Sequence, residues 1–86
     1  MIIIFNMASL PLADLQPGSH GRLDGEAVGE ARERLLDLGF VAGTEVRVIR
    51  RGPFGDPVEL ELRGYRVCLR RGDLTGLGVT LAEDAG

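Results

Sequence analysis

The chain has 86 residues, a formal net charge of −3 at pH 7 and a hydrophobic fraction of 44%. This length supports one domain with one core and leaves little room for a deep, enclosed substrate pocket. The net charge argues against general attraction to nucleic-acid phosphates, a single cysteine excludes an intramolecular disulfide, and no apolar run approaches the roughly 18 to 20 residues that span a bilayer. We therefore expect a small cytoplasmic domain.

The first nine residues, MIIIFNMAS, differ from the rest of the chain. Residues 2–5 have strong β propensity and no polar face. We expect residues 1–9 to be a flexible extension. The alternative is an added edge strand that pairs with another subunit, because exposed apolar strands invite pairing. Residues 83–86 read as a polar tail, so the predicted domain covers residues 10–82.

The first half of this domain predicts a short lead-in turn over residues 10–18, a strand over residues 19–25 and one helix over residues 28–38. The helix prediction rests on an apolar stripe with spacings of three, four and three, formed by Val28, Ala31, Leu35 and Leu38. Gly39 is the expected helix stop, because glycine adopts positive φ readily.

The second half shows the period-two alternation of half-buried strands. Glycine and proline punctuate the segments between them. A short helical turn is expected over residues 71–75, before the last strand closes the sheet. The predicted strands cover residues 44–50, 58–63, 65–70 and 78–81. Five short strands with one helix between the first and second favour a small SH3-like barrel of the mainly β (α+β) class.

Four segments together carry a family resemblance. They are LADLQPG at 12–18, RLLDLGFVAGTEV at 34–46, RRGPFGDPVEL at 50–60 and GYRVCLRRGDL at 64–74. In order and spacing the chain resembles the ferrous iron transport protein A (FeoA) family over residues 10–81. Each segment alone is a weak signal, but the combination is specific. The chain departs from the family pattern at Ala42, where proline is frequent, and in the glycine-rich segment 74–78.

This resemblance implies an SH3-like barrel with a helix after its first strand. It also implies a cytosolic accessory protein of ferrous iron uptake that associates with the membrane transporter FeoB and its GTPase region, and that reaches the inner membrane only through FeoB. Transition-metal binding is implied for the family as a whole. The same module forms the C-terminal domain of DtxR-type iron-dependent repressors, so a stand-alone regulatory module is the alternative.

Residues suited to catalysis are sparse. His20 and Cys68 are the only natural base and nucleophile, and nothing in the sequence brings them together. The carboxylates are spread along predicted solvent faces, so no metal site is expected, and His20 is expected to be solvated. We expect no enzymatic activity and no cofactor.

A protein contact is the expected function of the surface. Two apolar residues, Leu36 off the helix stripe and Phe54 within a loop, are candidate contact residues, and each has the alternative of lying in the core. Arginines would supply a polar rim around them. These candidates are Arg50, Arg51, Arg66 and Arg70. Nucleic acid is a weaker partner class, because acidic residues interleave with the arginines and stacking aromatics are few. We expect no direct membrane insertion, and self-association stays open.

Overall fold

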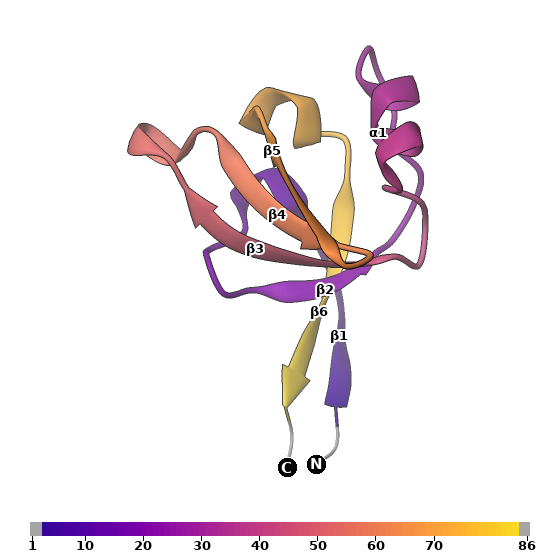
Figure 1. The fold of residues 1–86 in the computed structure, drawn as a ribbon. Coiled ribbons are helices and arrows are strands. Elements are labelled where there is room, and N and C mark those ends of the chain that lie inside the picture. Colours follow the sequence, from indigo (N-terminus) through magenta and orange to yellow (C-terminus); the bar gives the residue numbers. More distant parts are fainter. Residues whose placement is uncertain (1–2, 85–86) are drawn as a thin grey trace.

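The computed structural model describes residues 3–84 and consists of a six-stranded antiparallel sheet, one α-helix and three short 3-10 turns (Figure 1). The strands are β1 (Ile3–Pro11), β2 (His20–Leu23), β3 (Glu45–Arg51), β4 (Val58–Leu62), β5 (Tyr65–Leu69) and β6 (Gly78–Asp84). The helix is α1 (Arg32–Leu38), and the turns are η1 (Leu12–Asp14), η2 (Pro53–Gly55) and η3 (Arg71–Leu74). The strand order in the sheet is β1-β6-β2-β3-β4-β5.

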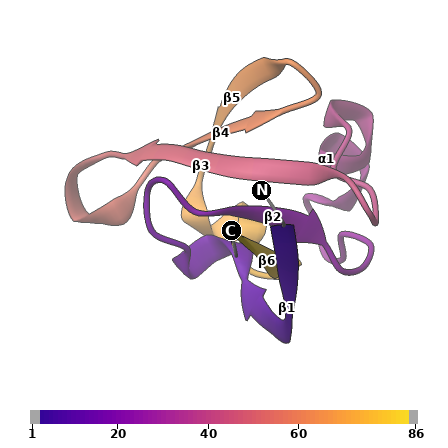
Figure 2. The same ribbon diagram turned by 90° about the horizontal axis from the view of Figure 1, so that it is seen from below.

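The mainly β fold with the helix before β3 is confirmed, but the sheet has one strand more than expected and stays open. It curls strongly, so that β1 and β6 run across the direction of β2 and β3 (Figures 1 and 2). β1 and β5 form its two edges. The last strand, β6, therefore lies inside the sheet between β1 and β2, where the sequence suggested that it would close a barrel.

The additional strand comes from the N-terminal segment. Residues 3–9, expected to be a flexible extension, belong to β1, which pairs with β6 from Ile3↔Asp84 to Pro11↔Gly78. The alternative was an added edge strand that pairs with another subunit. β1 is such an edge strand, but its pairing in the structure is with β6 of the same chain. Of the expected polar tail, residues 83 and 84 belong to β6. Residues 1–2 and 85–86 lie outside the described part of the chain.

The helix is shorter than predicted. It begins at Arg32, because Gly29 adopts a left-handed φ of 90° that interrupts the apolar stripe. Val28 is consequently outside the helix and 63% exposed, so its assignment to the buried stripe was wrong. Gly39 ends the helix with φ of 100°, as expected. No helix within residues 3–84 is long and apolar enough to cross a membrane.

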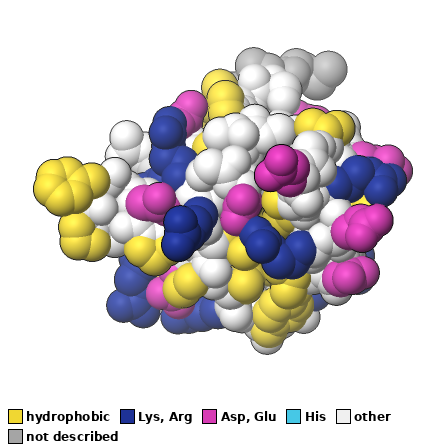
Figure 3. Space-filling view, turned by 90° about the horizontal axis from the view of Figure 1, so that it is seen from above, with side chains coloured by type: hydrophobic (Ala, Val, Ile, Leu, Met, Phe, Trp, Pro, Cys, Tyr) yellow, Lys and Arg dark blue, Asp and Glu magenta, His cyan; other side chains and the backbone are white. Residues whose placement is uncertain are grey.

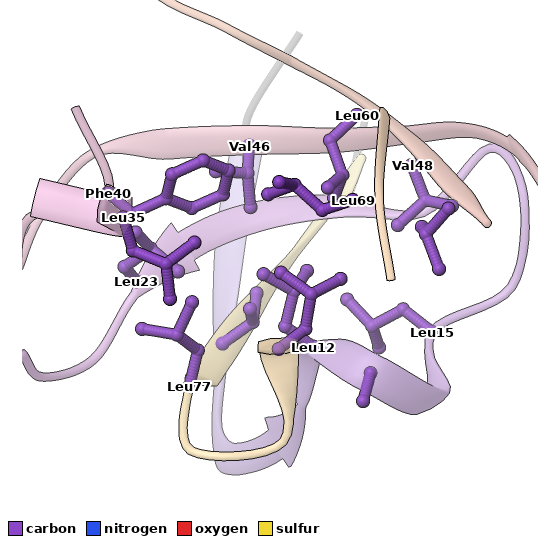
Figure 4. Close-up of a cluster of buried hydrophobic side chains, with 14 of the residues drawn as sticks. Leu12, Leu15, Leu23, Leu35, Phe40, Val46, Val48, Leu60, Leu69 and Leu77 are labelled. Atoms are coloured by element: carbon purple, nitrogen blue, oxygen red, sulfur yellow. The ribbon is translucent and has the colours of Figure 1, made fainter. Parts of the chain in front are cut away.

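The hydrophobic core fills the concave side of the curled sheet and gathers residues from the strands β2 to β6, from α1 and from the turns η1 and η3 (Figure 4). Leu12 enters it from η1 and Leu15 from the position directly after η1. Leu35 enters from α1, and Phe40 from the turn after α1. The strands contribute alternate residues, as period-two patterning predicts. These are Leu23, Val46, Val48, Val58, Leu60, Leu62, Leu69 and Val79.

β2 and β6 approach one another unusually closely at Gly21. A Cβ atom on this residue would lie 2.2 Å from the Thr80 carbonyl oxygen. Next to this crossing, the Asp24 carboxylate accepts hydrogen bonds from the Ser9 and Thr80 hydroxyls, which hold its pKa below the usual value. The Asp24 carboxylate thus joins β1 and β6 to the end of β2.

Candidate protein-interaction site

Phe54 stands at the tip of the loop between β3 and β4. Its exposed fraction is 106%, so the phenyl ring makes no buried contact within the domain. Its backbone has φ of 60° and ψ of 22°, a left-handed conformation that is rare for a bulky residue. Of the two alternatives for Phe54, the structure selects the exposed one. Figure 3 shows hydrophobic side-chain atoms protruding at the end of the molecule where this loop lies.

Arg51 fixes the base of the Phe54 loop. Each nitrogen of its guanidinium donates to a backbone carbonyl: Nε to Leu15 at 2.9 Å, Nη1 to Gly55 at 3.0 Å and Nη2 to Ala13 at 2.5 Å. Leu15 and Ala13 belong to the η1 region, whereas Gly55 directly follows Phe54. Arg51 therefore turns into the loop, and its contribution to a contact is to position Phe54.

Arg71 supports the same loop from the other side. Its backbone N–H donates to the Asp56 carboxylate at 2.8 Å, and its Nε donates to the Ala13 carbonyl at 3.3 Å. Its guanidinium also pairs with Asp14. No local pattern in the sequence indicates Arg71 as a contact residue, because its partners lie 15 to 58 residues away in the chain.

Arg50 and Arg66 are held by acidic residues of β4. Arg50 Nε lies 2.6 Å from Glu59 Oε1, and Arg66 Nη1 lies 3.6 Å from Glu59 Oε2. Arg66 also meets Glu61 at 3.4 Å. Opposite charges on neighbouring strands offset one another in this way. Acidic and basic side chains are also interleaved on the face of the molecule that Figure 3 shows.

Arg70 differs from the other predicted arginines. It follows β5 directly, is exposed, and its side chain has no hydrogen-bond or ion-pair partner within the described residues. The Arg71–Asp56 hydrogen bond brings it next to the base of the Phe54 loop. Arg70 is therefore available to pair with an acidic group of another molecule.

Leu36 is half-buried on α1 and does not join this group. Figures 1 and 2 place α1 and the β3–β4 loop at opposite ends of the molecule. The structure thus brings Phe54 together with Arg50, Arg51 and Arg70, and separates Leu36 from them. A contact through Leu36 would be a second, separate region.

Metal-binding groups are not clustered. Within residues 3–84 no three side chains of His, Cys, Asp or Glu lie close enough together to hold a metal ion. His20 is half-buried on β2, and Cys68 is an exposed free thiol on β5.

A family model described as the FeoA domain matches residues 10–81. The chain belongs to the FeoA family. A curated relative, the "Fe(2+) transport protein A/Fe(2+) transporter FeoB fusion protein" of Porphyromonas gingivalis, is 36% identical over an alignment of 73 residues that covers 81% of this chain. The chain spans only 8% of that relative's length.

Two solved FeoA structures extend the comparison. The FeoA protein of Chlorobium tepidum is 35% identical with a TM-score of 0.75, over 90% of this chain and 75% of its own. The FeoA of Stenotrophomonas maltophilia, a prokaryotic SH3 domain protein complexed with zinc, is 25% identical with a TM-score of 0.72, over 90% and 99% of the chains. The SH3-like fold is thereby confirmed for this FeoA-family chain.

The solved structure of IdeR from T. acidophilum shares the fold alone. It is 18% identical to this FeoA-family chain, with a TM-score of 0.71 over 91% of this chain and 36% of its own. At this level of identity the likeness says nothing about a shared partner or activity.

Proposed function

We propose that this FeoA-family chain is a cytosolic, non-enzymatic accessory protein of ferrous iron uptake that binds the cytosolic part of a FeoB-type transporter. The single observation that carries the proposal is the relative in which a FeoA segment and a FeoB transporter form one polypeptide. A covalent link holds two modules at high effective concentration. Separate chains need a binding surface to achieve the same association.

The Phe54 loop is the surface that we assign to this contact. A fully exposed phenyl ring loses its contact with water only when a partner covers it, and aromatic residues dominate the energy of many interfaces. The left-handed backbone of Phe54 costs stability, and strained residues of this kind are concentrated at functional sites. Because Arg51 holds the loop in place, little ordering entropy is lost on binding.

The arginines near the base of the Phe54 loop indicate the character of the partner. Arg50 and Arg70 flank the loop, and Arg66 lies further along β5. The complementary surface is thus an apolar pocket with an acidic rim. Leu36 would form a separate contact at the other end of the molecule.

The test is a titration against the purified cytosolic domain of the FeoB-type transporter from the same organism, without nucleotide, with GDP and with a GTP analogue. We expect saturable binding that differs between nucleotide states. Phe54→Ala should weaken binding by at least about tenfold, as expected for an interface hot spot. Val28→Ala is the matched control, because Val28 is also exposed and apolar but lies outside the loop.

Binding that is equally strong for Phe54→Ala and the native chain would exclude the loop as the contact. Absence of binding to both the cytosolic domain and the full-length transporter would overturn the proposed function. The alternative of a regulatory module related to the repressors rests on the likeness of fold alone.

A further inference from the structure

β5 is an open edge of the sheet. Its register with β4 is continuous, from Leu62↔Tyr65 to Val58↔Leu69. The two strands are joined by two residues, Arg63 and Gly64, with φ of 50° and 83°. Positive φ at both positions is the signature of the tight two-residue hairpin turn, in which the flanking pair is hydrogen-bonded in both directions.

This register determines which backbone groups of β5 are free. Hydrogen-bonded and non-hydrogen-bonded pairs alternate along an antiparallel ladder, starting from the bonded pair Leu62↔Tyr65. Arg66 and Cys68 therefore occupy non-bonded positions, and their N–H and C=O groups point away from β4. Both residues are exposed, and no backbone hydrogen bond joins this edge to another segment within residues 3–84.

The edge lacks most of the features that block strand addition. Proline and β-bulges commonly protect such edges, and neither occurs along the β4–β5 pairing. Arginine is the only protective residue type present. It repels other cationic strands but attracts acidic ones.

The face next to this edge is locally basic. Cross-strand pairing places Arg47 and Glu61 opposite each other, and Glu61 opposite Arg66. Arg50 and Cys68 both pair with Glu59 in the adjacent row. With Arg70, which continues β5 in extended conformation, four arginines accompany two glutamates, a local charge of +2 on a chain of net −3.

This charge distribution distinguishes between two kinds of strand that could pair with the free edge of β5. A second copy that paired antiparallel through β5 around Cys68 would place Arg66 opposite Arg70 of the other copy, and like charges in opposed positions are unfavourable. An extended segment with acidic residues at alternate positions would place them on the same face as these arginines.

We propose that the free edge of β5 binds an extended acidic peptide as an added strand, through the backbone groups of Arg66 and Cys68. Main-chain hydrogen bonds supply the pairing and alternate side chains supply the selectivity, as in other cases of strand addition. This inference does not depend on the identity of the transporter partner.

The probe is the acetylated and amidated heptapeptide Glu-Thr-Glu-Val-Glu-Thr-Glu, titrated into the ¹⁵N-labelled full chain. We expect saturable shifts and slowed hydrogen exchange at the Arg66 and Cys68 amides. The peptide with lysine in place of each glutamate should bind at least tenfold more weakly. Absence of saturable shifts at these two amides with the acidic peptide would overturn the proposal.

Cys68→Pro removes the outward N–H while leaving the β4–β5 ladder intact, because proline is tolerated where the N–H faces away from the sheet. It should reduce affinity for the acidic peptide at least tenfold, whereas Cys68→Ala, which keeps the N–H, should bind like the native chain. Equal binding by the proline and alanine variants would overturn the proposal.

Arg70→Glu provides a test that leaves every backbone group in place, should the proline variant fail to fold. It should lower affinity for the acidic peptide and raise affinity for the lysine peptide. If Arg70→Glu prefers the acidic peptide over the lysine peptide as strongly as the native chain does, the charge argument is overturned. Concentration-dependent dimerisation that Cys68→Pro abolishes would identify a second copy as the occupant and would also overturn the proposal.

Discussion

Arg51 donates a hydrogen bond to the carbonyl oxygen of Ala13, 2.5 Å away and 38 residues earlier in the chain. Together with the bonds to Leu15 and Gly55, it joins η1 to the β3–β4 loop. No strand pairing connects the loop with η1 at this point. The side-chain hydrogen bonds of Arg51 connect these two segments instead.

Arg51→Ala should therefore lower the free energy of unfolding by about 2 to 3 kcal/mol, because it leaves three carbonyls without their charged donor. Arg51→Lys should lose about half as much, since an ammonium group cannot form the same fork. Urea denaturation measures both. Arg70→Ala is the control and should stay within about 0.5 kcal/mol of the native chain. An equally small effect for Arg51→Ala would contradict the assigned role.

Replacement of Phe54 separates stability from binding. Phe54→Ala should leave the free energy of unfolding nearly unchanged, because the ring is fully exposed. Phe54→Gly should stabilise the domain by up to about 1 kcal/mol, because glycine adopts positive φ without strain. Thermal denaturation of both variants tests this. Phe40→Ala, which empties a fully buried site, should cost about 3 to 5 kcal/mol in comparison.

Gly21→Ala should be among the most damaging small substitutions. The new methyl group would lie 2.2 Å from the Thr80 carbonyl oxygen and 2.9 Å from the Leu81 Cα, both backbone atoms of β6. We expect a loss of at least about 2 kcal/mol, measured by denaturant titration. Gly25→Ala is the matched control, because no atom lies within 4 Å of its Cβ position. Similar stability of the two variants would disprove the close approach.

The hydrogen-bonded Asp24 carboxylate should make the free energy of unfolding depend on pH in the acidic range. Hydrogen bonds from Ser9 and Thr80 lower its pKa in the folded state below 3.8. A lowered folded-state pKa adds stability above the unfolded value, and this stability is lost as the pH falls through the folded value. Asp24→Asn should thus flatten the fall in stability below pH 3.8. Melting curves between about pH 2 and 7 test this. An equally steep fall in stability at low pH for the native chain and for Asp24→Asn would refute it.

Local patterns in the sequence predict the strands well. The alternation at Val58, Leu60 and Leu62 is confirmed residue by residue, because burial in a hairpin follows a period of two. The predicted hairpin partner, β5, follows after a two-residue turn. The interactions that decide these elements lie within a few residues of each other, so the sequence displays them.

Elements decided by distant or competing interactions were harder to predict. Val28 has the right spacing for the helix stripe, but the positive φ of Gly29 takes it out of the helix. The sequence contains this glycine, and glycine within a helical pattern is a warning signal. The local β propensity near the N-terminus suggested a strand as an alternative, but the pairing of residues 3–9 with β6 could not be read from any local pattern. Its partners lie between 71 residues (Ser9↔Thr80) and 81 residues (Ile3↔Asp84) further along the chain.

The candidate site was predictable in its residue types and not in its geometry. Phe54 is a large apolar residue in a loop, where polar residues are usual, and for this reason it is a candidate contact residue. Its exposure could not be decided without the position of the core. The inward turn of Arg51 depends on Ala13 and Leu15, and the distance of Leu36 from the loop depends on the whole fold.

The pairing of β1 with β6 also has a consequence for the topology of the polypeptide. Ile3 and Asp84 are Cα partners in adjacent strands, whose axes lie about 4.8 Å apart. A linker of a few residues could therefore join the ends into a covalent ring. Cyclisation would restrict the unfolded ensemble and prevent the edge strand from detaching first. Since the end of the β1–β6 pair that holds Ile3 and Asp84 lies away from both the β3–β4 loop and α1, the ring would keep both candidate contact regions accessible (Figure 1).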